Sequence, residues 1–413
     1  MQSLRNKPEQ LDATISHGKP YAATTRSPVA MSALPVLSWH EDGAEKSARW
    51  RSESGTPPPK RVLIADDHMT ADTAYRLACE GTALLWRGDF QNARQLLQAM
   101  ARRADEKPRA RKTKNIAATP AAAFHLHRQA QSQRARTLGM LLLPFNAGHS
   151  IPLRRAPDVH LACTDAYGPA AEEPYIASLR ELQGLIGAYE WRKNGVEIPA
   201  LGARIHPHYG VFAPIRGEYI GLVNDAPLPH LAATRSLAFD IGTGTGVLAA
   251  VLARRGIKRI VATDQDPRAL ACARENLARL NLAAQVDVVQ ANLFPEGRAA
   301  LIVCNPPWLP ARPSSPLEHA IFDPDSRMLR GFLNGLAAHL ETGGEGWLIL
   351  SDLAEHLGLR SRAELLAAIA AAGLQVLGKM DVKPHHPRVS DTSDPLYAAR
   401  AAELTSLWRL AAK

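Results

Sequence analysis

The fold of this chain is decided by the stretch Ser236-Leu-Ala-Phe-Asp-Ile-Gly-Thr-Gly-Thr-Gly246. Its first six residues are mostly apolar, as in a buried strand, and its glycines let the backbone turn sharply and approach a ligand closely. A helical pattern over 246–255 follows at once. Strand, glycine loop and helix in this order indicate an open α/β sheet, in which the ligand binds beyond the carboxyl ends of the strands.

Strand and helix alternate along the rest of the C-terminal half, which predicts a largely parallel sheet. Further strands are predicted at 259–263, 285–290, 299–304, 346–351, 374–381 and 404–410, which makes seven in all. Helices are predicted at 267–280, 327–340 and 362–372. Asp325 or Ser326 is expected to cap the helix that begins near Arg327, because both side chains can accept backbone N–H groups.

A second motif, Asn305-Pro306-Pro307-Trp308, follows the predicted strand 299–304, about 60 residues after the glycine loop. An amide or an aromatic amine is a poor nucleophile because its lone pair is delocalised. The side-chain oxygen of Asn305 and the carbonyl of Pro306 can accept its two N–H groups, and the lone pair then turns outward. The prolines hold these carbonyls rigidly, and Trp308 offers a flat face for stacking. The tetrapeptide therefore predicts methyl transfer to a planar nitrogen.

Side chains at the ends of the next two strands are expected to hold the rest of a cofactor. Asp264 ends the second strand, where a carboxylate can accept hydrogen bonds from two vicinal ribose hydroxyls. Asn292 follows the third strand and can bond an adenine edge, with Leu293 and Phe294 able to sandwich the ring. The loop has the spacing GxGxG rather than the GxGxxG of pyrophosphate-binding loops, which argues against a dinucleotide dehydrogenase.

With both motifs in place, residues 205–411 resemble the class I S-adenosylmethionine-dependent methyltransferases. The resemblance implies S-adenosylmethionine as cofactor and a Rossmann-like α/β fold, a doubly wound sheet of seven strands with the last strand antiparallel. It also implies the cofactor-binding residues, with Asp240, Gly242, Thr243, Gly244 and Gly246 at the methionine part, Asp264 at the ribose, and Asn292 and Leu293 at the adenine. The implied catalytic residues are Asn305, Pro306, Pro307 and Trp308. The family often has Asp at the position of Asn292.

Within this superfamily the chain is most similar to the protein-glutamine N5-methyltransferases that act on release factors and a ribosomal protein. Those enzymes have Asn-Pro-Pro-Tyr where Trp308 stands here, and they carry a Val-x-x-Pro-Arg-like segment where this chain has 209–216. The resemblance implies that the acceptor is a glutamine side chain of a translation protein. The same tetrapeptide serves RNA methyltransferases that act on the exocyclic amine of adenine or guanine, so RNA is the alternative acceptor. A catalytically silent binding module is disfavoured, because every predicted position keeps a competent residue.

The N-terminal half carries no catalytic motif and is expected to form separate parts. Residues 1–68 are rich in Ser, Pro, Thr and charge, which predicts a disordered tail, and Met31 offers an alternative start. Apolar spacing predicts a helical module over 69–200, and the catalytic domain then occupies 201–413. Within the module, helices are predicted as a hairpin over 70–103 broken at Gly88-Asp89, and at 125–143 and 174–192.

Charge and composition limit the kinds of partner and the cellular compartment that we expect for this protein. The net charge is +9, and the segment 101–136 alone holds ten Lys or Arg against two acidic residues. Such a run is either a handle for RNA phosphates or a solvated helix face. No apolar run approaches the roughly 20 residues needed to span a bilayer, so no membrane association is expected. We expect no metal site and a cytoplasmic protein, because the four cysteines lack CxxC spacing: Cys79, Cys163, Cys272 and Cys304.

Overall fold

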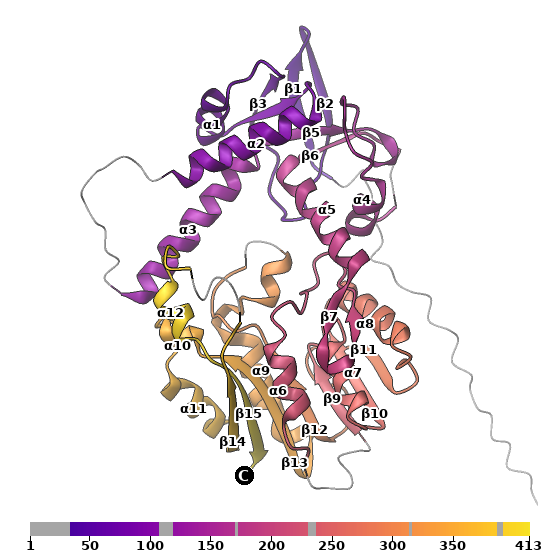
Figure 1. The fold of residues 1–413 in the computed structure, drawn as a ribbon, viewed down its shortest axis with the longest axis vertical. Helices are drawn as coiled ribbons and strands as arrows, with labels where there is room; N and C mark the ends of the chain where they lie inside the picture. The colour runs from indigo at the N-terminus through magenta and orange to yellow at the C-terminus, as the bar shows by residue number, and fades with distance from the viewer. Residues whose placement is uncertain (1–33, 107–118, 170–171, 230–236, 314–315, 386–390) are drawn as a thin grey trace, which may run out of the picture.

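Two α/β parts joined by long helices make up the protein in the computed structural model (Figure 1). The structure describes residues 34–106, 119–169, 172–229, 237–313, 316–385 and 391–413. In the described residues no helix is both long enough and apolar enough to cross a membrane.

The C-terminal part is built on a seven-stranded sheet with the order β11-β10-β9-β12-β13-β15-β14. Strand β15 runs antiparallel to both of its neighbours, and the other pairs are parallel. The α/β fold with seven strands, the last one antiparallel, is therefore confirmed. The strands are β9 (Leu237–Ile241), β10 (Arg259–Asp264), β11 (Val286–Gln290), β12 (Ala299–Cys304), β13 (Leu340–Ser351), β14 (Leu374–Val382) and β15 (Thr405–Ala412).

Helices cover both faces of this sheet, and each face has its own apolar core. One face packs on α6 (Glu218–Asp225), α7 (Val247–Arg254) and α8 (Pro267–Arg279). The other packs on α9 (Arg327–His339) and α11 (Arg362–Ala371). The central strand β12 is buried along its whole length, as its unbroken apolar sequence requires. The smaller elements are β7 (Val196–Ile198), β8 (Ala203–Ile205), α10 (Leu353–His356) and α12 (Tyr397–Ala402).

Helix α9 is capped by a residue other than the two expected. Ser326 precedes the helix in a left-handed conformation and makes no capping bond through its side chain, and Asp325 is also left-handed. The carboxylate of Asp323 instead accepts the backbone N–H groups of Met328 and Leu329, at 3.0–3.1 Å. The expectation of a cap at Asp325 or Ser326 was wrong because the chain doubles back before the helix and brings an earlier carboxylate to its first turn.

The N-terminal part contains a six-stranded mixed sheet with the order β1-β2-β6-β5-β4-β3. Its strands are β1 (Val36–Glu41), β2 (Ala44–Trp50), β3 (Arg61–Ala65), β4 (Thr82–Trp86), β5 (Leu141–Phe145) and β6 (Tyr175–Ser178). Its helices are α1 (Ala71–Cys79), α2 (Phe90–Asp105), α3 (Pro120–Leu138), α4 (His160–Tyr167) and α5 (Leu179–Asn194). The prediction of an entirely helical module over 69–200 was therefore wrong, as was that of a disordered tail where it covers β1 to β3. Residues 1–33 of that tail lie outside the described residues.

The strand β4 explains why the helical hairpin prediction failed. Leu84 and Trp86 point into the core shared with the helices, whereas Ala83 and Leu85 point into a second core on the other face of the sheet. A strand buried on both faces is a short continuous apolar run, which periodicity cannot separate from a piece of buried helix. The edge strands β1 and β3 also approach each other, so the sheet curls around the second core.

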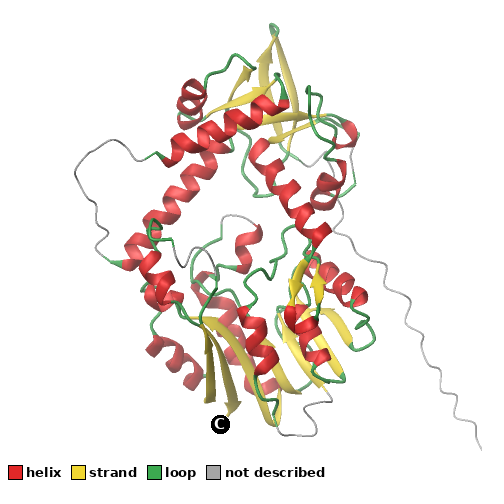
Figure 2. Ribbon diagram, in the orientation of Figure 1, coloured by secondary structure: helices red, strands yellow, loops and turns green. Residues whose placement is uncertain are grey.

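Helices α3 and α5 run from the N-terminal part to the C-terminal part on opposite sides of the molecule (Figure 2). The C-terminal end of α3 packs on α2, and its N-terminal end reaches a small core of the C-terminal part through Phe124. Helix α5 leads into the two-stranded unit of β7 and β8, next to α7 and α8. The two parts therefore touch at both sides and enclose a space between them.

Candidate functional site

A large cavity of about 2470 Å³ lies between the two parts, bounded by both. Its floor is made by the loops that leave the carboxyl ends of β9, β10, β11 and β12. The opposite wall includes α3 and residues near the start of α5. The sheet order changes direction between β9 and β12, so the floor coincides with the place where open α/β sheets bind ligands.

The glycine loop lies on this floor, with the carboxylate of Asp240 beneath it. Gly242, Thr243 and Gly244 line the cavity, whereas Asp240 is 1% exposed and does not. The Asp240 carboxylate accepts the hydroxyl of Thr243 at 2.7 Å and the backbone N–H of Ala249 at 3.0 Å. Burial raises the pKa of Asp240 to about 6, although these two bonds lower it. The geometry gives Asp240 a role in holding the loop to helix α7.

All three loop glycines, Gly242, Gly244 and Gly246, have a positive φ that a side chain resists, and at two of them a side chain would also meet a neighbouring residue. Gly242 has a φ of +72° and Gly246 a φ of +82°. A Cβ at Gly242 would meet the terminal methyl of Met328 at 2.5 Å, and a Cβ at Gly246 would crowd the backbone of Ala273 on α8 at 3.2 Å. Gly242 therefore keeps the floor open beside Met328, and Gly246 lets α7 and α8 pack closely.

Asp264 projects into the same cavity from the end of β10. One carboxylate oxygen accepts the backbone N–H of Gly244 at 3.0 Å and the other that of Asp266 at 3.0 Å. Burial raises the pKa of this carboxyl, and no cation among the described residues forms an ion pair with it. Each oxygen still has capacity to accept another hydrogen bond, as a pair of ribose hydroxyls would require.

Of the three residues expected around an adenine ring, only Leu293 lines the cavity. Leu293 lines the cavity, whereas Asn292 is exposed and does not line it. Phe294 faces α9, where its ring stacks on His339 with centroids 4.3 Å apart. The expected sandwich of Leu293 and Phe294 around a ring was therefore wrong, because the apolar surface of α9 binds the phenyl ring instead.

The tetrapeptide leaves the sheet next to the glycine loop. Cys304 pairs in register with Ile241 on the parallel strand β9, so Asn305 and Gly242 emerge side by side. All four residues of the tetrapeptide line the cavity. The indole N–H of Trp308 donates a hydrogen bond to the side-chain oxygen of Asn305 at 2.9 Å. Because an indole N–H can only donate, this bond selects the orientation of the Asn305 amide.

The segment 209–216 brings a cation to Trp308. The guanidinium of Arg216 lies 5.8 Å from the centre of the Trp308 ring and donates to the buried carboxylate of Glu403 at 3.2 Å. Glu403 also accepts the hydroxyl of Ser351 at the end of β13. The indole is thus held between Asn305 and Arg216, and it forms one wall of the site.

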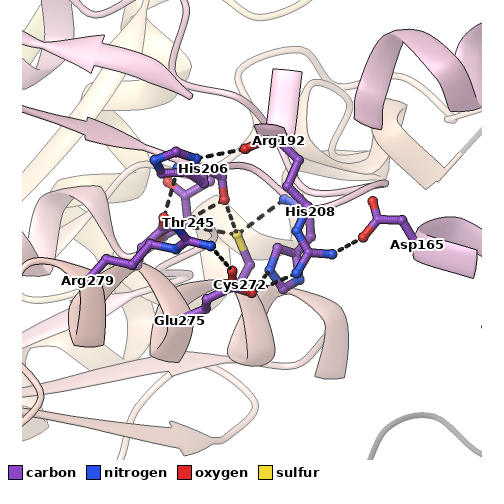
Figure 3. Close-up of polar contacts among 9 residues, drawn as sticks. Asp165, Arg192, His206, His208, Thr245, Cys272, Glu275 and Arg279 are labelled. Atoms are coloured by element: carbon purple, nitrogen blue, oxygen red, sulfur yellow. Dashed lines mark hydrogen bonds and ion pairs between the residues drawn. The ribbon is translucent and has the colours of Figure 1, made fainter. Parts of the chain in front are cut away.

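A network of hydrogen bonds and ion pairs joins residues 192–208, which lead into the C-terminal part, to helix α8 (Figure 3). Glu275 accepts hydrogen bonds from Arg192, His208 and Arg279 at 2.6–2.7 Å. Burial raises the pKa of Glu275, but these partners outweigh it and bring the pKa to about 2. Burial and Arg192 lower the pKa of His208, and its Nε2–H donates to the Glu275 carboxylate, which can only accept. The histidine therefore serves to position the chain.

The same network reaches the glycine loop through Asn276. Its amide nitrogen donates to the carbonyl oxygens of Thr245 and His206, at 3.1 and 3.2 Å, and its oxygen accepts the backbone N–H of His206. Asn276 is 1% exposed. The sequence analysis did not predict this role of Asn276, because a single Asn on an amphipathic helix is usually a surface residue.

Three of the ten basic residues in the segment 101–136 form ion pairs within the protein. Arg103 donates to Asp72 at 2.6 Å, Arg134 to Asp105 at 2.7 Å, and Arg128 lies 3.3 Å from Glu318. Five of the ten basic residues, at 107, 109, 111, 112 and 114, lie outside the described residues.

Comparison with known proteins agrees with this geometry. Residues 222–361 match the family model of the methyltransferase small domain. The part of the chain around the cavity floor is therefore similar to S-adenosylmethionine-dependent methyltransferase domains over residues 222–361. Its glycine loop, Asp264 and tetrapeptide fall within the matched residues, and S-adenosylmethionine is the cofactor of such domains.

The methyltransferase domain has relatives named for translation proteins. The chain is 34% identical over 181 residues to a release factor glutamine methyltransferase from Cereibacter sphaeroides, which covers 40% of this chain and 62% of the relative. It is 51% identical over 69 residues to a ribosomal protein L11 methyltransferase from Pelotomaculum thermopropionicum, covering 16% and 22%. A solved L11 methylase from Lactobacillus delbrueckii subsp. bulgaricus is 20% identical, with a TM-score of 0.33, over 48% of this chain and 79% of that one. The chain spans less than two thirds of the length of the first two relatives.

Proposed function

We propose that this chain is an S-adenosylmethionine-dependent N-methyltransferase and that its acceptor is the side-chain amide of a glutamine in a translation protein. One observation carries the proposal. Because Cys304 and Ile241 are register partners, Asn305 lies beside Gly242, and both line one cavity with Asp264. A residue suited to binding an amide is thus adjacent to residues suited to binding the cofactor.

The residues around the cavity suit the two ends of the cofactor. Asp264 would accept the ribose hydroxyls, and the glycine loop would lie against the methionine part. When bound, S-adenosylmethionine supplies an electrophilic methyl group. Asp240 would support the loop from below without touching the ligand, because it is buried and does not line the cavity.

Asn305 would prepare the acceptor nitrogen. Its side-chain oxygen accepts the Trp308 indole and, with two lone pairs, can accept one further N–H from the acceptor amide. The carbonyl of Pro306 would accept the second N–H. The acceptor lone pair is then turned away from its own carbonyl and toward the methyl group, so that orientation supplies most of the rate and no strong base is needed.

Two observations support a protein acceptor over RNA. Three arginines of the basic segment, Arg103, Arg128 and Arg134, form ion pairs within the protein. The relatives that share the domain are named for a release factor and a ribosomal protein, which supports a translation protein as the substrate.

The test is transfer from radiolabelled S-adenosylmethionine into an extract of cells that lack this gene. We expect the wild type to incorporate label that protease digestion removes and RNase digestion does not. The variant Asn305→Ala should incorporate no label. Label lost to RNase alone would establish RNA as the acceptor and refute the proposal of a protein acceptor. Cofactor binding without any transfer would instead identify a silent binding module.

A further inference from the structure

We propose that the N-terminal part positions the acceptor side of the active site through α3, whose Phe124 and Arg128 hold the segment 309–323 that follows the tetrapeptide. The inference rests on the proposed function, and it assigns a role to a part of the chain that carries no catalytic motif. Segment 309–323 will be called the acceptor segment, and its described residues are 309–313 and 316–323.

Arg128 contacts the acceptor segment in three ways. Its guanidinium donates to the carbonyl oxygen of Arg312 at 2.7 Å, lies 3.3 Å from the carboxylate of Glu318, and stacks 3.8 Å above the centre of the Phe322 ring. An exposed ion pair alone would contribute little. A planar guanidinium that stacks and donates in fixed directions constrains its partners more strongly than a point charge does.

Phe124, one helical turn earlier on α3, adds an apolar contact. It is 3% exposed, and its ring lies 6.5 Å from that of Phe322. It belongs to a small core in which all the other buried residues come from the catalytic part: Leu309, Leu353, Ala354, Leu357 and Leu396. The N-terminal end of α3 is thus built into the catalytic part.

The acceptor segment passes this restraint to both halves of the active site. Leu309, directly after Trp308, forms a bridge with Phe322, and the carbonyl of Leu309 accepts the N–H of Asp323 at 2.8 Å. Asp323 in turn caps α9 at Met328, whose side chain reaches Gly242. A displacement of Phe322 would therefore shift both the tetrapeptide and the start of α9.

The middle of α3 has no apolar face of its own. Residues 129–133 are exposed, and the helix carries only Phe124, Thr137 and Leu138 as buried residues, all near its ends. A helix that is polar all round commonly bridges two bodies. Helix α3 is thus anchored to the N-terminal part at one end and to the acceptor segment at the other.

The experiment compares Arg128→Ala, Arg128→Lys and Arg103→Ala in the full chain. Arg103 is the matched control, because its ion pair with Asp72 lies entirely within the N-terminal part. The readouts are amide hydrogen exchange of 309–323, affinity for S-adenosylhomocysteine, and the initial rate of label transfer into the gene-deleted extract. Exchange and affinity need no acceptor, so they are informative even if the proposed function fails.

For Arg128→Ala we expect exchange of the acceptor segment to rise about tenfold and the transfer rate to fall about tenfold to a hundredfold, since small misplacements are costly for oriented reactants. Affinity for S-adenosylhomocysteine should stay within twofold, Arg128→Lys should be intermediate, and Arg103→Ala should match the wild type. Unchanged exchange in Arg128→Ala, or an equal rise in Arg103→Ala, would overturn the inference. If Arg128→Ala does not fold, Glu318→Gln replaces it with the same expected direction. If the wild type transfers no label but exchange of the acceptor segment still rises in Arg128→Ala and not in Arg103→Ala, the positioning by α3 is supported and the proposed function is refuted.

Discussion

Replacing Asp240 by Asn should change how the stability of the protein depends on pH. The Asp240 carboxylate is buried under the glycine loop and accepts hydrogen bonds from Thr243 and Ala249. An Asn oxygen can accept the same two bonds, so the substitution mainly removes the charge. Burial raises the pKa of Asp240 from 3.8 to about 6, and the neighbouring carboxylate of Asp264 acts in the same direction.

The magnitude follows from the pKa difference. A rise from 3.8 to about 6 corresponds to about 3 kcal/mol between the two protonation states. Between these values the folded protein holds a proton at Asp240 that the unfolded chain has released. The free energy of unfolding therefore falls as pH rises through this window, and the full cost of the buried charge is present above it.

The assay is urea unfolding of the wild type and Asp240→Asn at several pH values from 3 to 7. The difference in free energy of unfolding between the two should shift by about 3 kcal/mol in favour of Asp240→Asn across this range. Asp287→Asn, at an exposed carboxylate on β11, serves as the control for a surface substitution. A difference that stays constant with pH would refute the reasoning, because it would mean that Asp240 titrates alike in both states.

Three further substitutions test the site itself. Asn305→Ala should abolish methyl transfer while calorimetry shows cofactor affinity within a few-fold, and a collapse of affinity would make Asn305 a structural residue. Asp264→Ala should weaken cofactor binding by about 1.5–3 kcal/mol for each of two lost hydrogen bonds, and calorimetry showing an unchanged affinity would remove Asp264 from the site. Gly242→Ala should cost about 1–2 kcal/mol in urea unfolding, because Gly242 has a φ of +72°. Met328 can move aside from the new methyl group, and Gly184→Ala on helix α5 should instead stabilise by about 0.5–1 kcal/mol; equal effects of the two substitutions would contradict the strain argument.

The catalytic half was predictable because its signals are local. Its strands are short apolar runs separated by amphipathic helices, and all seven were located from sequence, with β12 at its observed bounds. Parallel strands end at the same edge of a sheet, so residues after β9, β10 and β12 had to meet there. The meeting of Gly242, Asp264 and Asn305 around one cavity follows from that rule.

The N-terminal half was misread because its signals are ambiguous. Strand β4 presents alternate side chains to two cores and therefore looks like a continuous apolar run. Strand β2 has only one buried residue, Trp50, so it reads as an irregular polar segment. Such strands gain their stability from their neighbours in the sheet, which composition does not reveal.

The sequence by itself determined the methyltransferase sheet, its glycine loop and the place of the tetrapeptide, because these depend on backbone conformation and on the burial of nearby residues. Only the tertiary structure decided that Trp308 donates to Asn305, that Asp323 caps α9, and that Arg128 meets Glu318 across 190 positions of the chain. Contacts of this kind depend on how whole elements pack, and the same side chains in another packing would find other partners.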